Sequence, residues 1–104
     1  MKDDDLEISK EKIKDGIKLI LKGRINSSSA DVLRLELDEA IRDEQKNIIL
    51  NLLRVDYLSS AGIRVILKIY KDAALIGARF GIEMPSANVK NVLGMTALDE
   101  LLIK

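Results

Sequence analysis

The sequence predicts a single α/β domain in which helices pack on a mixed sheet of four or five strands. The chain has 104 residues, 47% of them hydrophobic and 33% charged, which suits one core in one domain over residues 1–104. An Asp-Gly turn separates two apolar segments near the N-terminus, as in a β-hairpin. Behind it, segments with strand and helix periodicity alternate, which is typical of α/β domains.

The first half of the chain predicts a hairpin and then a long helix. Leu6, Ile8 and Ile13 mark one strand, and Ile17–Gly23 forms the second after the turn. The serine-rich stretch 26–29 offers side-chain oxygens that can cap a helix. Apolar residues then recur at helical spacing as far as Asp43, at Ala30, Leu33, Leu37, Ala40 and Ile41.

The second half continues the alternation of strands and helices. Asn47–Leu53 is a continuous apolar run, and we expect it to be a central strand covered on both faces. A helix follows over Ala61–Ile76, ended by Gly77. Its predicted apolar face consists of Ile63, Ile66, Leu67, Tyr70 and Ala74.

The C-terminal part predicts three short elements. Arg79–Met84 should be a strand that Pro85 stops. Asn88–Leu93 should be a short helix ended by Gly94, and Leu101–Ile103 should close the sheet.

Composition excludes several functions. Seventeen basic residues balance seventeen acidic ones, so no large cationic field attracts nucleic acid or a membrane surface. The sequence has no cysteine, no signal-peptide pattern and no apolar run near the ~20 residues that span a bilayer. We therefore expect a cytoplasmic protein with no direct contact to nucleic acid or membrane.

Catalysis is also disfavoured. The chain lacks histidine, the commonest general base and metal ligand. A nucleophilic Ser60 would need another base, and neither Lys68 nor Lys71 forms a Ser-x-x-Lys pattern with it. Phosphate-binding glycine loops are missing too. We expect a non-enzyme that holds no metal or cofactor.

Asp56–Arg64 carries most of the functional information, because there the central strand leads into the second helix. Ser59 and Ser60 lie where a helix N-terminus favours negative charge, so the fold should tolerate a phosphate on either serine. A simple N-cap explains one serine equally well and is the more common role. Ala61 and Gly62 are small enough to let the helix begin close to the sheet.

The segment Val55–Leu67 resembles the signature of bacterial anti-sigma factor antagonists, in the STAS family. The resemblance extends to Ile48–Leu52 before it and to Val89–Leu98 near the end. In that family the serine two positions before the glycine is phosphorylated, which corresponds to Ser60. Ser59 stands where relatives often have aspartate, and it is the alternative acceptor.

The resemblance also implies a surface that binds the partner protein. Residues expected on it are Tyr57, Leu58, Ser59, Ala61, Gly62, Arg64 and Asn26. Asn26 ends the stretch Gly23-Arg24-Ile25-Asn26, in which an amide replaces the family's common acid. Arg64 could contact the partner or the phosphate, although such an arginine more often only covers a helix face.

The family's mechanism is partner switching. The unmodified protein, a soluble monomer, binds a serine kinase that is also the anti-sigma factor, and thereby frees the sigma factor. Phosphorylation ends this binding, and a serine phosphatase of the PP2C type restores it. The alternative is a non-catalytic STAS scaffold of a stress-signalling assembly or an accessory subunit of a transporter.

Overall fold

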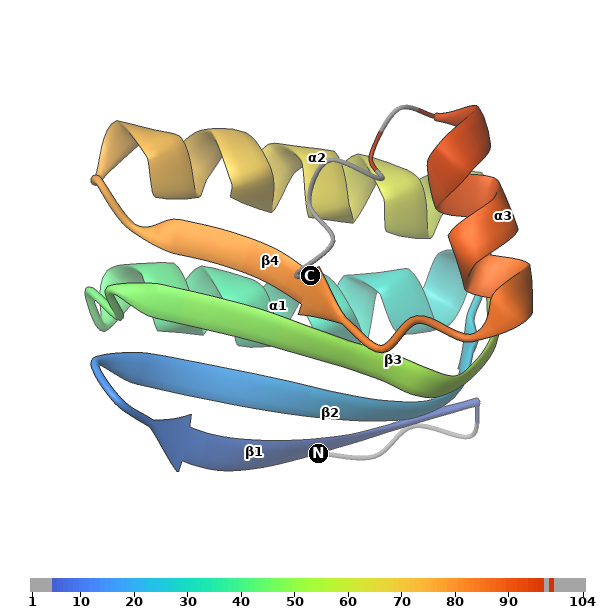
Figure 1. The fold of residues 1–104 in the computed structure, drawn as a ribbon, viewed down its shortest axis with the longest axis horizontal. Helices are drawn as coiled ribbons and strands as arrows, with labels where there is room; N and C mark the ends of the chain where they lie inside the picture. The colour runs from blue at the N-terminus through green and yellow to red at the C-terminus, as the bar shows by residue number, and fades with distance from the viewer. Residues whose placement is uncertain (1–4, 97, 99–104) are drawn as a thin grey trace.

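The computed structural model describes residues 5–96 and 98, and within them it confirms an α/β domain. The elements in chain order are β1 (Leu6–Ile13), β2 (Gly16–Ile25), α1 (Ser27–Arg42), β3 (Asn47–Leu58), α2 (Ser60–Leu75), β4 (Arg79–Glu83) and α3 (Ala87–Met95). The described part forms a four-stranded sheet of order β1-β2-β3-β4 (Figure 1). β1 pairs antiparallel with β2, whereas β2, β3 and β4 are parallel. The predicted closing strand Leu101–Ile103 lies outside the described residues.

The hairpin and the first helix follow the prediction. Asp15 takes the left-handed conformation, with a φ of 60°, and the register pairs Ile13 with Gly16. Asn26 caps α1 because its side chain accepts the N–H groups of Ser28 and Ser29. The Ser29 hydroxyl oxygen in turn accepts the Asn26 N–H, which completes a capping box. These local contacts set where the chain leaves β2.

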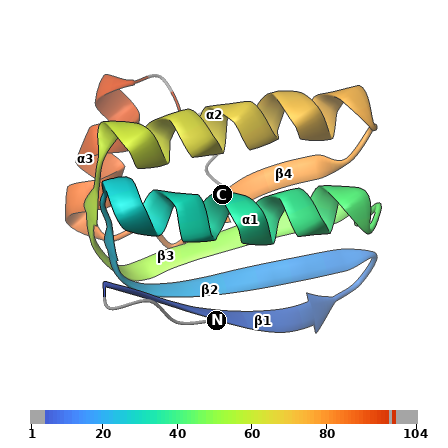
Figure 2. The ribbon, with the colours of Figure 1, turned by 180° about the vertical axis from the view of Figure 1, so that it is seen from behind.

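One face of the sheet holds the core, because α1 and α2 both cover that face (Figures 1 and 2). The largest fully buried side chains are Leu6, Leu19, Leu21, Ile25, Leu33, Leu37, Ile48, Leu50, Leu52, Ile66, Ile69 and Ile82. They come from all four strands and from both of these helices. Burial on this scale removes enough apolar surface from water to drive folding.

The expectation that the central strand is covered on both faces is wrong for the described residues. Burial alternates along the first half of β3: Ile48, Leu50 and Leu52 are buried, whereas Leu53 is half exposed. Such alternation marks a strand packed on one face. The run looked uniformly apolar because Ile49 and Leu53 occupy positions on the less buried side.

A group of three polar side chains lies on the sheet face opposite α1 and α2. The Lys18 ammonium lies 2.9 Å from the Glu83 carboxylate, and the Asn51 amide donates to the same carboxylate at 2.9 Å. One residue comes from each of the three parallel strands, so the group ties them together side by side.

The predicted apolar face of α2 is partly wrong. The buried residues are Gly62, Val65, Ile66, Ile69 and Ala73. Leu67 and Tyr70, which we expected in the core, are each 38% exposed, and Ala74 is exposed as well. The buried face is therefore rotated towards Gly62. Gly77 follows the C-cap residue Ile76 with a φ of +71°, as a terminating glycine should.

The last described helix is longer than predicted. α3 begins after its N-cap Ser86 and continues to Met95, so Gly94 lies inside the helix and does not end it. The Thr96 hydroxyl donates to the carbonyl oxygens of Val92 and Leu93, which satisfies the last turn. The prediction failed because a side-chain hydroxyl, and not a glycine, completes this terminus.

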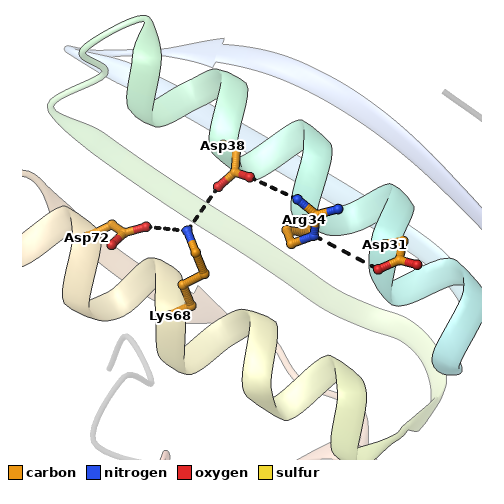
Figure 3. A network of polar contacts seen from close by, with 5 residues as sticks. All are labelled: Asp31, Arg34, Asp38, Lys68 and Asp72. Atoms are coloured by element: carbon orange, nitrogen blue, oxygen red, sulfur yellow. Dashed lines mark hydrogen bonds and ion pairs between the residues drawn. The ribbon is translucent and has the colours of Figure 1, made fainter.

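An ion-pair network joins the two long helices on their outer side (Figure 3). Lys68 of α2 lies 3.4 Å from Asp38 of α1 and 2.7 Å from Asp72 of its own helix. Asp38 also lies 3.4 Å from Arg34, which is 3.9 Å from Asp31. Such partly exposed pairs contribute little stability individually, and of these four contacts only Lys68–Asp38 joins one helix to the other.

Candidate functional site

The segment singled out in the sequence spans the end of β3 and the start of α2. Ser59 is the N-cap of α2 and Ser60 is its first residue. The Ser59 N–H donates to the Ile25 carbonyl at 2.9 Å, which ties this turn to the end of β2. β2 and β3 are parallel, so their carboxyl ends lie at the same edge of the sheet (Figure 1). Asn26 follows the end of β2, and Ser60 begins the helix that follows β3.

The two serines differ in their surroundings. The Ser59 hydroxyl oxygen accepts the Gly62 N–H at 3.1 Å, and the residue is only 9% exposed. Ser60 is exposed at the helix N-terminus. No acidic residue occupies the first turn of α2, so no negative charge there compensates the partial positive charge of the N-terminus.

Gly62 lets α2 begin in contact with the sheet. A Cβ at this position would lie 2.6 Å from Leu58 Cδ1 and 2.7 Å from Ile25 Cγ2. Leu58 and Gly62 are both buried, and Ala61 is half-buried. These three predicted binding residues therefore shape the surface from beneath, whereas Tyr57, Ser60 and Arg64 are exposed on it.

Asn26 has a long-range contact in addition to its cap. Its side-chain amide donates to the Asp5 carboxylate, with Nδ2 2.8 Å from Oδ2. Asp5 precedes β1, and the Arg24 N–H donates to its carbonyl oxygen at 2.8 Å. A hydrogen bond between residues 21 positions apart thus fixes a carboxylate beside the predicted binding surface.

Arg24 and Tyr57 form a stacked pair on the same edge. The Arg24 guanidinium carbon lies 4.6 Å from the centroid of the Tyr57 ring, within the range of a cation–π contact. The two residues are register partners in the pairing of β2 with β3. Both are exposed, so they present a cation and an aromatic ring to whatever approaches the edge.

Sequence reasoning did not identify Asp5 or Arg24 as site residues. A signal for Asp5 was nevertheless present. A hairpin that turns at Asp15-Gly16 pairs Leu6 with Gly23, so Asp5 must come next to Arg24.

The start of α3 also lies at this edge of the sheet, next to β3. The Ser86 hydroxyl donates to the Val55 carbonyl at 2.6 Å, and the Ser86 N–H donates to the Leu52 carbonyl at 3.2 Å. The Asn88 amide lies 3.4 Å from the Asp56 carbonyl oxygen. Side-chain caps thus hold α3 against β3 next to the serine turn (Figure 2).

Within residues 5–96 and 98, no group of three or more histidine, cysteine, aspartate or glutamate side chains could hold a metal ion. The same residues contain no helix that is long and apolar enough to cross a membrane. What the edge offers is a shaped surface with an exposed hydroxyl.

The sequence matches the STAS domain family over residues 7–104. It is 35% identical over 67 residues to BtrV of Bordetella bronchiseptica, provisionally named an anti-sigma factor antagonist. That match covers 64% of this chain and 58% of BtrV, so the chain spans less than two thirds of this relative. An anti-sigma F factor antagonist of Paenibacillus polymyxa is 29% identical over 79% of this chain and 71% of its own.

Solved structures share the fold. The unphosphorylated form of the anti-sigma factor antagonist SpoIIAA superposes with a TM-score of 0.83, over 93% of this chain and 86% of its own, at 19% identity. An anti-sigma factor antagonist of Mycobacterium paratuberculosis gives 0.83 at 18% identity, over 93% of this chain and 82% of its own. Phosphorylated SpoIIAA gives 0.76 at 18% identity, over 93% and 89%. At these identities the likeness establishes the fold.

Proposed function

The chain belongs to the STAS domain family, and on this premise we propose that it is an anti-sigma factor antagonist controlled by phosphorylation of Ser60. In its unmodified form it binds a serine kinase that also acts as the anti-sigma factor, and the sigma factor is released. The names of two relatives support the antagonist role. The exposed edge at the start of α2 is where the kinase binds.

The observation that carries the proposal is the contrast between the two serines. The Ser59 hydroxyl is engaged as the helix cap and the residue is 9% exposed, so a kinase could reach it only by breaking the cap. Ser60 is exposed at the first helical position. This difference supports Ser60 as the acceptor and Ser59 as a structural residue.

Phosphate on Ser60 acts on the interface and leaves the fold intact. It adds between about 1.5 and 2 negative charges and three acceptor oxygens. The helix N-terminus, with no acidic residue in its first turn, stabilises that charge within the domain. At a closely packed interface the same charge is desolvated and repelled, so the partner dissociates. A PP2C-type phosphatase reverses the change.

The proposal is tested by measuring kinase affinity and sigma release together. Each anti-sigma serine kinase of the source genome is purified with ADP and titrated with the unmodified chain, with and without bound sigma factor. We expect one kinase to bind and to release its sigma factor. No binding by any kinase, together with stable self-association of the chain, would instead support a non-catalytic scaffold.

A further inference from the structure

The last part of β3 is bulged where it pairs with β2. Lys22 and Arg24 are two residues apart on β2, whereas their register partners Arg54 and Tyr57 are three residues apart on β3. Burial along β3 changes in step, from every second residue to every third. The bulged end therefore presents two exposed side chains for each buried one. Bulges of this kind redirect side chains and are common next to functional sites.

The bulge brings Arg54 and Tyr57 to one face of the sheet. In a regular strand, two residues three positions apart point to opposite faces. Here both are exposed, and Val55 between them is buried. On β2, Arg24 shares a face with Lys18, because an even number of residues separates them. Arg24, Arg54 and Tyr57 thus lie together on the sheet face opposite α1 and α2.

The two arginines are exposed cations without an acidic partner in the described part of the chain. Within residues 5–96 and 98, neither Arg24 nor Arg54 forms an ion pair. The acidic residues at neighbouring strand positions are Asp5, Glu7 and Asp56. Stacking on Tyr57 at 4.6 Å holds the Arg24 guanidinium and leaves its N–H edge able to donate to a carboxylate.

This pair of arginines adjoins the proposed binding surface. The Ser59 N–H donates to the carbonyl of Ile25, the residue after Arg24. Tyr57 precedes Ser60 by three residues and is itself 43% exposed. A protein that covers the serine turn therefore meets the stacked pair next. Arginine and tyrosine are the residue types that most often dominate the binding energy of protein interfaces.

We propose that Arg24 and Arg54 bind an acidic segment of the kinase, and that Tyr57 is the positioning residue of Arg24. This inference rests on the proposed function. An arginine presents a planar fork of donors that matches a carboxylate. The two arginines lie diagonally across neighbouring strands, where long side chains can reach the same group. The contact of the kinase thus extends from the serine turn onto the sheet face opposite α1 and α2.

A purely structural role for the stack is the competing explanation. In that case Arg24 only steadies the end of the sheet, Arg54 is merely solvated, and neither affects binding. Arg24→Gln and Arg54→Gln each remove one positive charge from the proposed contact. Arg79→Gln is the matched control, because it removes the same charge from an exposed arginine at the other end of the sheet, where Arg79 pairs with Asn47.

The experiment titrates wild type and these three variants with the purified kinase that binds the chain, at two salt concentrations. We expect Arg24→Gln and Arg54→Gln to bind about five- to tenfold more weakly and with less salt dependence, at melting temperatures close to wild type. Arg79→Gln should bind like wild type. Wild-type affinity of Arg24→Gln or of Arg54→Gln, or equal losses in all three variants, would overturn this inference alone. A wild-type chain that binds no kinase would overturn the proposed function as well.

A double-mutant cycle tests the positioning role of Tyr57. Tyr57→Leu removes the ring on which the guanidinium stacks, whereas Tyr57→Phe keeps the ring and should bind like wild type. If Tyr57 acts through Arg24, the variant that combines Tyr57→Leu with Arg24→Gln should lose less affinity than the product of the two single losses. Single losses that multiply, or a Tyr57→Phe variant as weak as Tyr57→Leu, would contradict the positioning role.

Discussion

The Ser59 hydroxyl accepts the Gly62 N–H at 3.1 Å and closes the first turn of α2, while its neighbour Ser60 is exposed at the first helical position. One serine thus stabilises the helix that presents the other. The capping role and the exposed position therefore belong to different serines.

Replacing each serine by alanine should have different effects on stability. Ser59→Ala removes the N-cap and should lower the free energy of unfolding by about 1 kcal/mol, or roughly 4 to 8 °C in melting temperature. Ser60→Ala should stay within about 0.5 kcal/mol of wild type. Thermal denaturation of both variants measures the difference, and equal losses would refute the assignment of the cap to Ser59.

A permanent negative charge at Ser60 should weaken binding without unfolding the domain. We expect Ser60→Asp to reduce kinase affinity about tenfold or more, because a charge is placed within the proposed interface. Its melting temperature should equal or slightly exceed that of wild type, since a helix N-terminus favours an acid. Ser9→Asp, an exposed serine on β1, is the control and should bind normally. A large fall in the stability of Ser60→Asp would contradict the account.

Two glycine substitutions should change stability in opposite directions. Gly62→Ala places a methyl group 2.6 Å from Leu58 Cδ1 and should destabilise the domain by about 1 to 3 kcal/mol. In Gly94→Ala the added methyl group meets no atom of the other described segments within 4 Å, so this variant should stabilise α3 by about 0.5 to 1 kcal/mol. Urea denaturation of both variants tests the close approach of α2 to the sheet, and a Gly62→Ala variant as stabilised as Gly94→Ala would contradict it.

The Lys18–Glu83 pair should make stability depend on acid pH. Burial raises the pKa of Glu83, but hydrogen bonds from Lys18 and Asn51 outweigh it, so the pKa is lower than usual. A carboxylate with a lowered pKa contributes stability above its unfolded pKa, and this contribution is lost as pH falls through the folded pKa. The stability advantage of wild type over Glu83→Gln should therefore shrink from about pH 5 downwards.

Lys18→Met supplies the control for that pH profile. The hydrogen bond to Glu83 raises the pKa of Lys18, so both partners are charged at neutral pH. Replacing Lys18 should therefore make the free energy of unfolding depend less on pH in the acid range. If the free energy of unfolding of Lys18→Met falls with pH as steeply as that of wild type, the Lys18–Glu83 pair is not the source of the pH dependence.

Local signals in the sequence predicted most elements, and the errors arose where packing over long distances decides. The hairpin and the capped start of α1 depend on neighbouring residues, so they were predictable. The face of α2 was misplaced because Gly62, which has no side chain to score as apolar, marks the closest contact with Leu58 and Ile25. Leu67 and Tyr70 were expected in the core because they fit an apolar helical pattern, but they lie on the exposed side of α2.

The site was predictable only as far as the motif reached. The Ser59-Ser60 turn was identified from the strand-to-helix pattern and from resemblance. The contact between Asp5 and Asn26 joins residues 21 positions apart, and it follows from the hairpin register and not from any local pattern.

The most direct test of the central claim is mass spectrometry of the intact and fragmented protein after incubation with ATP and each anti-sigma serine kinase of the source genome. We predict a single phosphate, located on Ser60, and none in the Ser60→Ala variant. A phosphate on Ser59, or no modification by kinases shown to be active on a folded chain, would contradict the proposed switch.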